Sequence, residues 1–334
     1  MKTTKEVQRI AASALGGKDI KVENTEHVAR LWGGMGYIYR VHCHKINDSN
    51  ASKQSIIVKR IECGKESEQS FGDKRKAKSY VVECNFYSKY SLKLSKLNIC
   101  CEGLLCENND GNGNISIAMK SLPHPTISYL GGNNAFAAIR SISRLHAFFW
   151  GDKSIDAVNN GLASQGTYWY LDTRPDEFEN MSNKGFEGRL KSVAHKINRA
   201  LKKHPYQTCV HGGSKSCNMS LSIDPNLVCF VDFQHVGRSY AANDLAYLFV
   251  CGLDVDDDFE DNMEEKLINL YIDEMAKSGV NTLSLPVLKH ALNLAYADLY
   301  RWMCGWGIWG NGFLSDRVER CLDEILNEIS TTDL

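Results

Sequence analysis

Residues 211–218 read His211-Gly-Gly-Ser-Lys-Ser-Cys-Asn218, and Asp232-Phe-Gln234 follows fourteen residues after the asparagine. Short apolar stretches lie on either side, around Cys209 and over residues 228–233, with Asp224-Pro-Asn226 as a turn. This pattern predicts a hairpin, formed by the two apolar stretches, that holds a polar loop. Asparagine and aspartate oxygens are suitable ligands for a divalent cation.

The same offsets occur in the phosphotransfer pattern H-x-D-x-x-x-x-N followed by D-F-x. In that pattern the first Asp accepts the proton of the substrate hydroxyl, and the Asn and the later Asp hold the metal ions. His211, Asn218 and Asp232 stand at the matching positions, but Gly213 stands where the proton acceptor belongs. The sequence therefore predicts the framework of a phosphotransfer site without its general base.

Composition limits the possible classes of protein. The chain has 334 residues, 43% of them hydrophobic and 24% charged, with a formal net charge of -1. It can bury a sizeable core, and its charge gives no reason to expect a nucleic acid or an anionic membrane as a partner. No apolar run is long enough to span a bilayer, and residues 1–18 lack the apolar core of a secretory signal. We therefore expect a cytoplasmic protein.

Twelve cysteines are scattered through segments that read as core, and no C-x-x-C pair occurs. In a chain of this length, this usage favours free, buried thiols in a reducing compartment over disulfides or a structural zinc site. His42-Cys43-His44 alternates along a predicted strand, where ordinary strand residues are the favoured interpretation.

The first third of the sequence reads as strands with one helix. Strands are expected over residues 26–31, 37–45 and 55–61, around Leu104, and over residues 115–119. Residues 62–78 read as a charged loop and residues 79–94 as a helix. After Pro125 the pattern becomes helical, over residues 134–150, 188–203 and 263–278. We therefore predict an α+β protein: a small antiparallel β-rich unit over residues 1–120 and a larger, mainly helical unit over residues 121–334.

Three features of the first unit fit nucleotide binding. Gly33, Gly34 and Gly36 lie in a turn where backbone amides could approach phosphate oxygens, although most such turns are plain hairpins. Lys59 ends an apolar strand, where it could contact phosphates or simply be solvated. Glu83 could hold the Lys59 ammonium by a charge-assisted hydrogen bond or be a surface carboxylate. Their order along the chain, before the polar loop, makes a joint function the better interpretation.

With these motifs the chain resembles the ecdysteroid-kinase-like and CHK-kinase-like group, relatives of choline kinases and aminoglycoside phosphotransferases. The resemblance extends over nearly the whole chain. Its most specific parts are Asp232-Phe-Gln234 and residues 301–310, Arg301-Trp-Met-Cys-Gly-Trp-Gly-Ile-Trp-Gly310. Further parts are residues 167–177, Val231-Asp-Phe-Gln-His-Val-Gly237 and Asn243-Asp-Leu-Ala-Tyr247.

This resemblance implies a two-lobed protein-kinase-like fold, ATP and Mg²⁺ as cofactors, and phosphate transfer to the hydroxyl of a small molecule. By position, Lys59 would contact the phosphates and Glu83 would orient Lys59. Asn218 and Asp232 would bind the metal.

The resemblance also implies that His211 braces the catalytic loop and that Asp244 holds it by hydrogen bonds, although Asp244 could merely cap a helix. The vacant base position at Gly213 leaves two functions open: a weak phosphotransferase, or a pseudokinase that binds a nucleotide or metabolite without turnover. A second departure is Ala118-Met-Lys120-Ser-Leu122, where relatives tend to carry an acidic residue. It leaves the contacts to adenine open.

The acceptor molecule is less well indicated. Five aromatic residues fall close together: Tyr296, Tyr300, Trp302, Trp306 and Trp309. Their faces could hold a quaternary ammonium, but packing within the helical unit is favoured. The acidic residues within 254–261 could attract a cationic substrate or be a solvated face. Arg174 could contact an anionic group or bridge loops, and the bridging role is favoured.

Overall fold

The computed structural model describes residues 2–17, 19–46, 54–64, 67, 69–109, 113–128, 130–253, 263–310 and 313–331. The chain divides into two compact units, Met1–Pro123 and His124–Leu334. Among the described residues, none of the helices combines the length and the apolar character needed to span a membrane.

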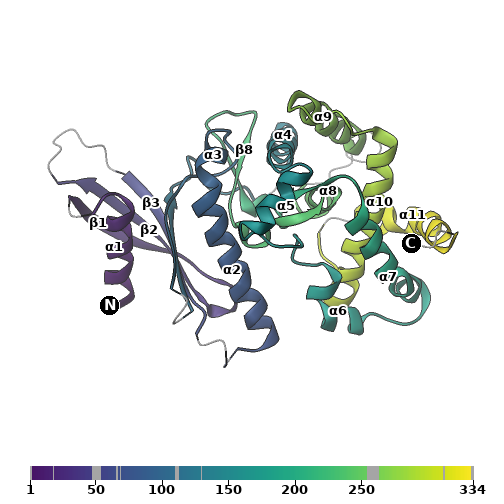
Figure 1. Ribbon diagram of the computed structural model, residues 1–334, viewed down its shortest axis with the longest axis horizontal. Helices are drawn as coiled ribbons and strands as arrows, with labels where there is room; N and C mark the ends of the chain where they lie inside the picture. The colour runs from purple at the N-terminus through teal and green to yellow at the C-terminus, as the bar shows by residue number, and fades with distance from the viewer. Residues whose placement is uncertain are drawn as a thin grey trace. The chain divides into compact units, whose positions relative to one another are not determined.

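The first unit is built on a five-stranded antiparallel sheet with the strand order β1-β2-β3-β5-β4. The longer helices α1 and α2 lie on opposite sides of this sheet (Figure 1). The elements are α1 (Lys2–Ala14), β1 (Ile20–Arg30), β2 (Gly36–Lys45), β3 (Gln54–Glu62), α2 (Phe71–Lys89), α3 (Ser91–Ser95), β4 (Gly103–Asn109) and β5 (Asn114–Lys120).

Strand β3 carries both core residues and a candidate site residue of the first unit. Successive side chains of a strand point to opposite faces of the sheet. Ile56 and Val58 are buried in a cluster with Val7 and Ile10 of α1. Lys59 therefore points to the other face, where it meets α2.

Helix α2 begins at Phe71, so the prediction of a loop over residues 62–78 is wrong for residues 71–78. The helix starts with a capping box between Ser70 and Asp73. The Ser70 hydroxyl accepts a hydrogen bond from the Asp73 amide at 3.1 Å, and the Asp73 carboxylate accepts one from the Ser70 amide at 3.2 Å. This exchange satisfies amides that the first turn leaves unpaired, which allows a lysine-rich stretch to be helical.

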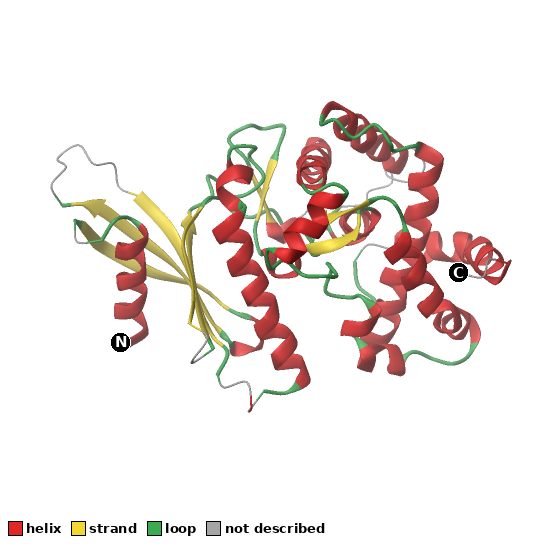
Figure 2. Ribbon diagram, in the orientation of Figure 1, coloured by secondary structure: helices red, strands yellow, loops and turns green. Residues whose placement is uncertain are grey.

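The second unit is mainly helical (Figure 2). Its first half contains α4 (Asn133–Phe148), α5 (Asp152–Asn159), α6 (Pro175–Asn180) and α7 (Gly185–Lys203). Its second half contains β6 (Gln207–Val210), β7 (Met219–Leu221), β8 (Val228–Phe230), β9 (Gly237–Tyr240), α8 (Ala242–Cys251), α9 (Met263–Lys277), α10 (Leu285–Trp306) and α11 (Phe313–Thr331).

The short strands of this unit form two separate antiparallel pairs, β6 with β9 and β7 with β8. The predicted pairing of the stretch around Cys209 with residues 228–233 is therefore wrong. Strand β8 pairs with β7 instead, because the turn over residues 224–226 closes a short loop at a low cost in entropy. Strand β6 then pairs with β9, which lies beyond Asp232 in the sequence.

Aromatic residues fill the core of the second unit. Tyr296 and Trp302 are fully buried, as the packing interpretation expects. Arg301 is buried beside them and donates hydrogen bonds to the Trp169 carbonyl at 2.7 Å and to the Asp298 carboxylate at 2.9 Å. Trp306, at the end of α10, is 54% exposed.

Candidate active site

The polar loop and Asp232 meet at the open end of the β7–β8 hairpin. Asn218 directly precedes β7, and Val231 directly follows β8. The Val231 amide donates to the Asn218 carbonyl at 2.9 Å, and the Val231 carbonyl lies 3.0 Å from Nε2 of His211. These backbone contacts bring His211, Asn218 and the segment that carries Asp232 to one place.

His211 supports this corner from inside. Its ring is buried against Phe230 and Phe233, with ring centroids 5.2 and 4.7 Å away. Burial lowers the pKa of His211, although the nearby charges of Asp244 and Asp232 act in the opposite direction. The neutral ring satisfies the contact with Val231 when its Nε2–H donates to the carbonyl.

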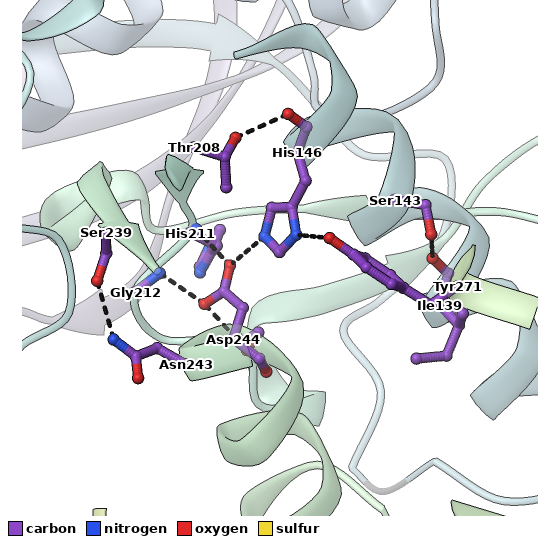
Figure 3. Close-up of polar contacts among 11 residues, drawn as sticks. Ile139, Ser143, His146, Thr208, His211, Gly212, Ser239, Asn243, Asp244 and Tyr271 are labelled. Atoms are coloured by element: carbon purple, nitrogen blue, oxygen red, sulfur yellow. Dashed lines mark hydrogen bonds and ion pairs between the residues drawn. The ribbon is translucent and has the colours of Figure 1, made fainter. Parts of the chain in front are cut away.

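Asp244 holds the loop by hydrogen bonds to the backbone amides of the loop (Figure 3). Its carboxylate accepts hydrogen bonds from the amide of His211 at 2.5 Å and from the amide of Gly212 at 2.9 Å. The Ser214 hydroxyl donates to the Asp244 carbonyl at 2.8 Å. Asp244 is the third residue of α8, whose N-terminus has no side-chain cap. The carboxylate therefore serves the loop and does not cap the helix.

Two further residues fix the Asp244 carboxylate from behind. Nε2 of His146 lies 3.1 Å from Oδ2 of Asp244, and Nδ1 of the same ring lies 2.9 Å from the Tyr271 hydroxyl (Figure 3). Both ring nitrogens of His146, the Asp244 carboxylate and the Tyr271 hydroxyl have a partner when Nε2–H donates to the carboxylate and the hydroxyl donates to Nδ1. Sequence reasoning missed both residues, because each lies within an apolar helical pattern that gives no sign of a polar contact.

The two central glycines of the loop differ in what they require. Gly212 has a φ of +76°, and a Cβ there would collide with the His235 carbonyl, so this position needs glycine. Gly213 has a φ outside this left-handed region. A Cβ at Gly213 would lie 3.6 Å from Nδ2 of Asn218 and 3.9 Å from Nδ1 of His211, which is ordinary van der Waals contact. The position without a base therefore accepts a Cβ atom without a clash.

The candidate metal ligands offer oxygen atoms. Asn218 donates through Nδ2 to the Gly213 carbonyl at 2.9 Å, which fixes the orientation of its amide group. Asp232 has a left-handed backbone, with φ 66° and ψ 61°, and one of its carboxylate oxygens accepts a hydrogen bond from the Gln234 amide. An amide oxygen and a carboxylate fit Mg²⁺, which is commonly bound by one or two protein ligands together with phosphates and water. Among the described residues, no group of three His, Cys, Asp or Glu side chains forms a metal site.

In the first unit, Lys59 and Glu83 form a buried ion pair. The Lys59 ammonium lies 2.6 Å from Oε2 of Glu83 and 5.2 Å from the centre of the Tyr80 ring. The lysine side chain is 5% exposed and that of Glu83 is 1% exposed. Of the two interpretations of Glu83, the surface carboxylate is therefore ruled out. The contact of Lys59 with phosphates stays a prediction.

The glycine-rich turn between β1 and β2 is a short 3₁₀ segment over Trp32–Gly34. Gly33, Gly34 and Gly36 have φ values of 71°, 71° and 138°. The Gly34 amide donates to the Leu31 carbonyl at 3.0 Å, so in this conformation it is not available to a phosphate.

These contacts join a histidine-braced loop, an Asn–Asp pair and a carboxylate that holds the loop, all between residues 211 and 244. Residues 152–283 match the ecdysteroid kinase-like family. The predicted resemblance to this family is confirmed over that range, which includes the loop and Asp232. A comparison with curated protein sequences finds no match.

Solved structures of small-molecule kinases share the fold. An amicoumacin kinase in complex with AMP-PNP and Ca²⁺ is similar with a TM-score of 0.54 and 14% identity, over 92% of this chain and 90% of that one. Choline kinase from Cryptosporidium parvum gives 0.53 and 11%, over 98% and 95%. Ethanolamine kinase from Plasmodium vivax gives 0.50 and 11%, over 93% and 84%. At these identities the likeness shows the fold alone, and it confirms the predicted protein-kinase-like class.

The Arg174 guanidinium lies over Trp302 and Trp306, two of the aromatic residues that could hold a quaternary ammonium. Its guanidinium carbon lies 5.5, 5.8 and 5.7 Å from the ring centres of Tyr168, Trp302 and Trp306. The side chain also pairs with Glu177 at 3.0 Å and donates to the Tyr168 carbonyl at 2.6 Å. The bridging role of Arg174 is therefore the one that its contacts support. The acidic run over residues 254–261 lies outside the described residues.

Proposed function

We propose that this protein binds ATP with Mg²⁺ and transfers phosphate slowly to the hydroxyl of a small molecule. The observation that carries the proposal is a loop that Asp244 and Asn218 hold by hydrogen bonds around a vacant base position at Gly213. The protein would act in the cytoplasm, where its twelve free cysteines would stay reduced.

Each residue group has a role in this proposal. Lys59, held by Glu83, would contact the phosphates of the nucleotide. Asn218 and Asp232 would hold the metal ion, which supplies positive charge to the phosphate oxygens when it is bound. His211 and Asp244 would keep the loop in shape without touching the substrate.

The missing base should cost rate rather than binding. A positioned general base contributes about 10²- to 10⁴-fold in rate. A kinase with an ordinary turnover of about 1–100 s⁻¹ would then keep roughly 10⁻⁴ to 1 s⁻¹. Phosphoryl transfer keeps part of its rate without a general base, because its loose transition state depends mainly on positioning and on the charge of the metal.

A pseudokinase that binds nucleotide or metabolite without turnover is the second candidate. The contacts of the loop favour it, because neither of the two residues after Gly213 is placed to replace the base. The Ser214 hydroxyl already donates to the Asp244 carbonyl at 2.8 Å. Lys215 lies 6.0 Å from the centre of the Trp309 ring, and a lysine is ordinarily protonated.

Restoring the carboxylate separates the two candidates. Gly213→Asp should raise kcat by about 10²- to 10⁴-fold if the rest of the site is active. Gly213→Asn is the matched control, since it has the same size but no proton acceptor, and it should leave kcat unchanged. ATP consumption is measured with a panel of small alcohols. Measurable turnover by wild type supports the slow phosphotransferase, and its absence leaves the pseudokinase. Equal, measurable rates for Gly213→Asp and wild type, with Mg-ATP bound by both, would show that the argument from the missing base is wrong.

Binding of the nucleotide is tested directly. Wild type should bind Mg-ATP with a Kd on the order of micromolar, a free energy of about −8 kcal/mol. Asp232→Ala should weaken Mg-ATP binding about tenfold or more and abolish its dependence on Mg²⁺, because the change removes a metal ligand. Asp224→Ala, in the turn at the far end of the same hairpin, is the control and should bind as wild type. Calorimetry with and without Mg²⁺ measures both, and an Asp232→Ala variant that binds normally contradicts the metal assignment.

A further inference from the structure

The second unit contains a polar cavity of about 180 Å³ that the proposed phosphotransfer site does not use. Neither the loop over residues 211–218 nor Asp232 lines it. The polar groups around it include six from α7, β9, the start of α8 and α10: Asn198, Lys202, Arg238, Ser239, Asn243 and Asp298. All of these residues belong to one compact unit, so the cavity is complete within it.

Two buried polar atoms of this cavity have no hydrogen-bond partner. Asn243 is 6% exposed, and its Nδ2 donates to the Ser239 hydroxyl at 2.9 Å while Oδ1 has no partner. Figure 3 shows this oxygen pointing away from Ser239. Exchange of the amide oxygen and nitrogen would leave an NH₂ group unpaired instead, so one polar atom of Asn243 is unsatisfied in either orientation. Nε of Arg238 is the second such atom. A buried polar atom without a partner is costly, and a ligand would remove that cost.

The charges that line the cavity do not cancel. Lys202 pairs with Asp172 at 3.0 Å, and Asp298 pairs with Arg301 at 2.9 Å. Arg238 forms no ion pair within the described part of the chain, and an arginine keeps its charge at any ordinary pH. The uncompensated charge is therefore positive, which favours an anion.

We propose that this cavity is a binding site for a small carboxylate that also carries a hydroxyl or amino group. The carboxylate would take two parallel hydrogen bonds from Arg238, a geometry that the planar guanidinium favours. The hydroxyl or amino group would donate to the unpaired oxygen of Asn243. A cavity of about 150 Å³ holds a benzene molecule, so there is room here for about six to eight non-hydrogen atoms. The site does not depend on nucleotide binding.

Calorimetry with three probes, D-glycerate, L-lactate and L-serine, tests the site. At least one should bind the wild-type protein with a millimolar or lower Kd, and propionate, which lacks the donor, should bind more weakly. Arg238→Met should weaken binding about tenfold or more, as expected for the loss of a charge-assisted pair. Arg199→Met, an exposed arginine of α7, is the matched control and should bind as wild type.

The proposal would be overturned if none of the three probes binds at concentrations up to about 20 mM. A Kd of 20 mM corresponds to a binding free energy of about −2 kcal/mol. Equal affinity of the Arg238→Met variant would also overturn the proposal. A crystal of the wild-type protein soaked in D-glycerate gives a test that needs no variant. Density for the carboxylate against Arg238 supports the site, and an empty cavity at the same probe concentration overturns it.

Discussion

Asp244 concentrates the support of the candidate loop in one buried carboxyl group. Burial would raise its pKa, but the hydrogen bonds from His146 and from the Gly212 amide lower the pKa below its ordinary value. The group is therefore ionised at neutral pH, and the amides of His211 and Gly212 have a charged acceptor.

Removal of this carboxylate should destabilise the second unit strongly. Asp244→Ala leaves two backbone amides and His146 without an acceptor, and each unpaired buried group costs about 1–3 kcal/mol, so we expect a loss of about 3 kcal/mol or more. Asp156→Ala, an exposed carboxylate on α5, should change stability by less than about 0.5 kcal/mol. Urea unfolding followed by the fluorescence of the buried Trp169 and Trp302 measures both. A small effect of Asp244→Ala would show that the loop is held by other contacts.

At the scale of single residues, the sequence was informative where a motif sets the spacing. His211, Asn218 and Asp232 lie close along the chain and at known offsets, so their proximity could be predicted. His146 could not, because it is separated from Asp244 by 98 positions and only the packing of α4 against the loop brings them together.

Helix α2 shows how one element positions a candidate site residue. Its capping box at Ser70 and Asp73 starts the helix that carries Glu83 to Lys59. The capping signal, a serine followed three residues later by an acidic residue, was present in the sequence. The prediction of a loop gave weight to the charged, lysine-rich composition instead.

The cap should make a measurable contribution. Ser70→Ala removes the acceptor of the Asp73 amide and should lower the free energy of unfolding by about 0.5–2 kcal/mol. The control is Ser192→Ala in the interior of α7, where the exposed hydroxyl only donates back to the Arg189 carbonyl and we expect less than about 0.5 kcal/mol. Equal effects of the two changes in urea unfolding would mean that packing alone sets the start of α2.

Strand pairing was harder to predict than helix position. The apolar stretches that became β6 and β8 were both recognised, but a strand pattern does not state its partner. The partner of β6 is β9, on the far side of Asp232, and that choice depends on tertiary packing.

For the whole molecule, two histidines whose pKa is lowered by full or partial burial predict loss of stability in acid. Burial lowers the pKa of His211, and burial followed by the charge of His290 lowers that of His204 from 6.5 to about 4. Below pH 6.5 the unfolded chain binds these protons and the folded chain does not, so acid favours unfolding. We expect the free energy of unfolding to fall between pH 6.5 and about 4.

The contribution of His204 can be isolated with a variant. His204→Gln should reduce the pH dependence in this range by up to about one proton. His124→Gln, an exposed histidine, should leave it unchanged. Urea unfolding at a series of pH values measures the slope, and a stability that is flat or rises on acidification contradicts the assignment.

At the largest scale, the kinase-like fold and the family over residues 152–283 were predicted and are confirmed. The order of the motifs along the sequence was enough to predict the fold, because a fold is specified by many positions at once. The roles of Lys59, Asn218 and Asp232 stay predictions, since a fold alone does not determine chemistry.

The room for a Cβ atom at Gly213 has a consequence for how this chain can change over generations. The shape of its loop depends on Asp244 and Gly212, not on whichever residue stands between Gly212 and Ser214. The activity of this loop and its folded shape therefore depend on different residues. A lineage could lose a carboxylate at this position, or acquire one, by a single substitution that leaves the rest of the architecture intact.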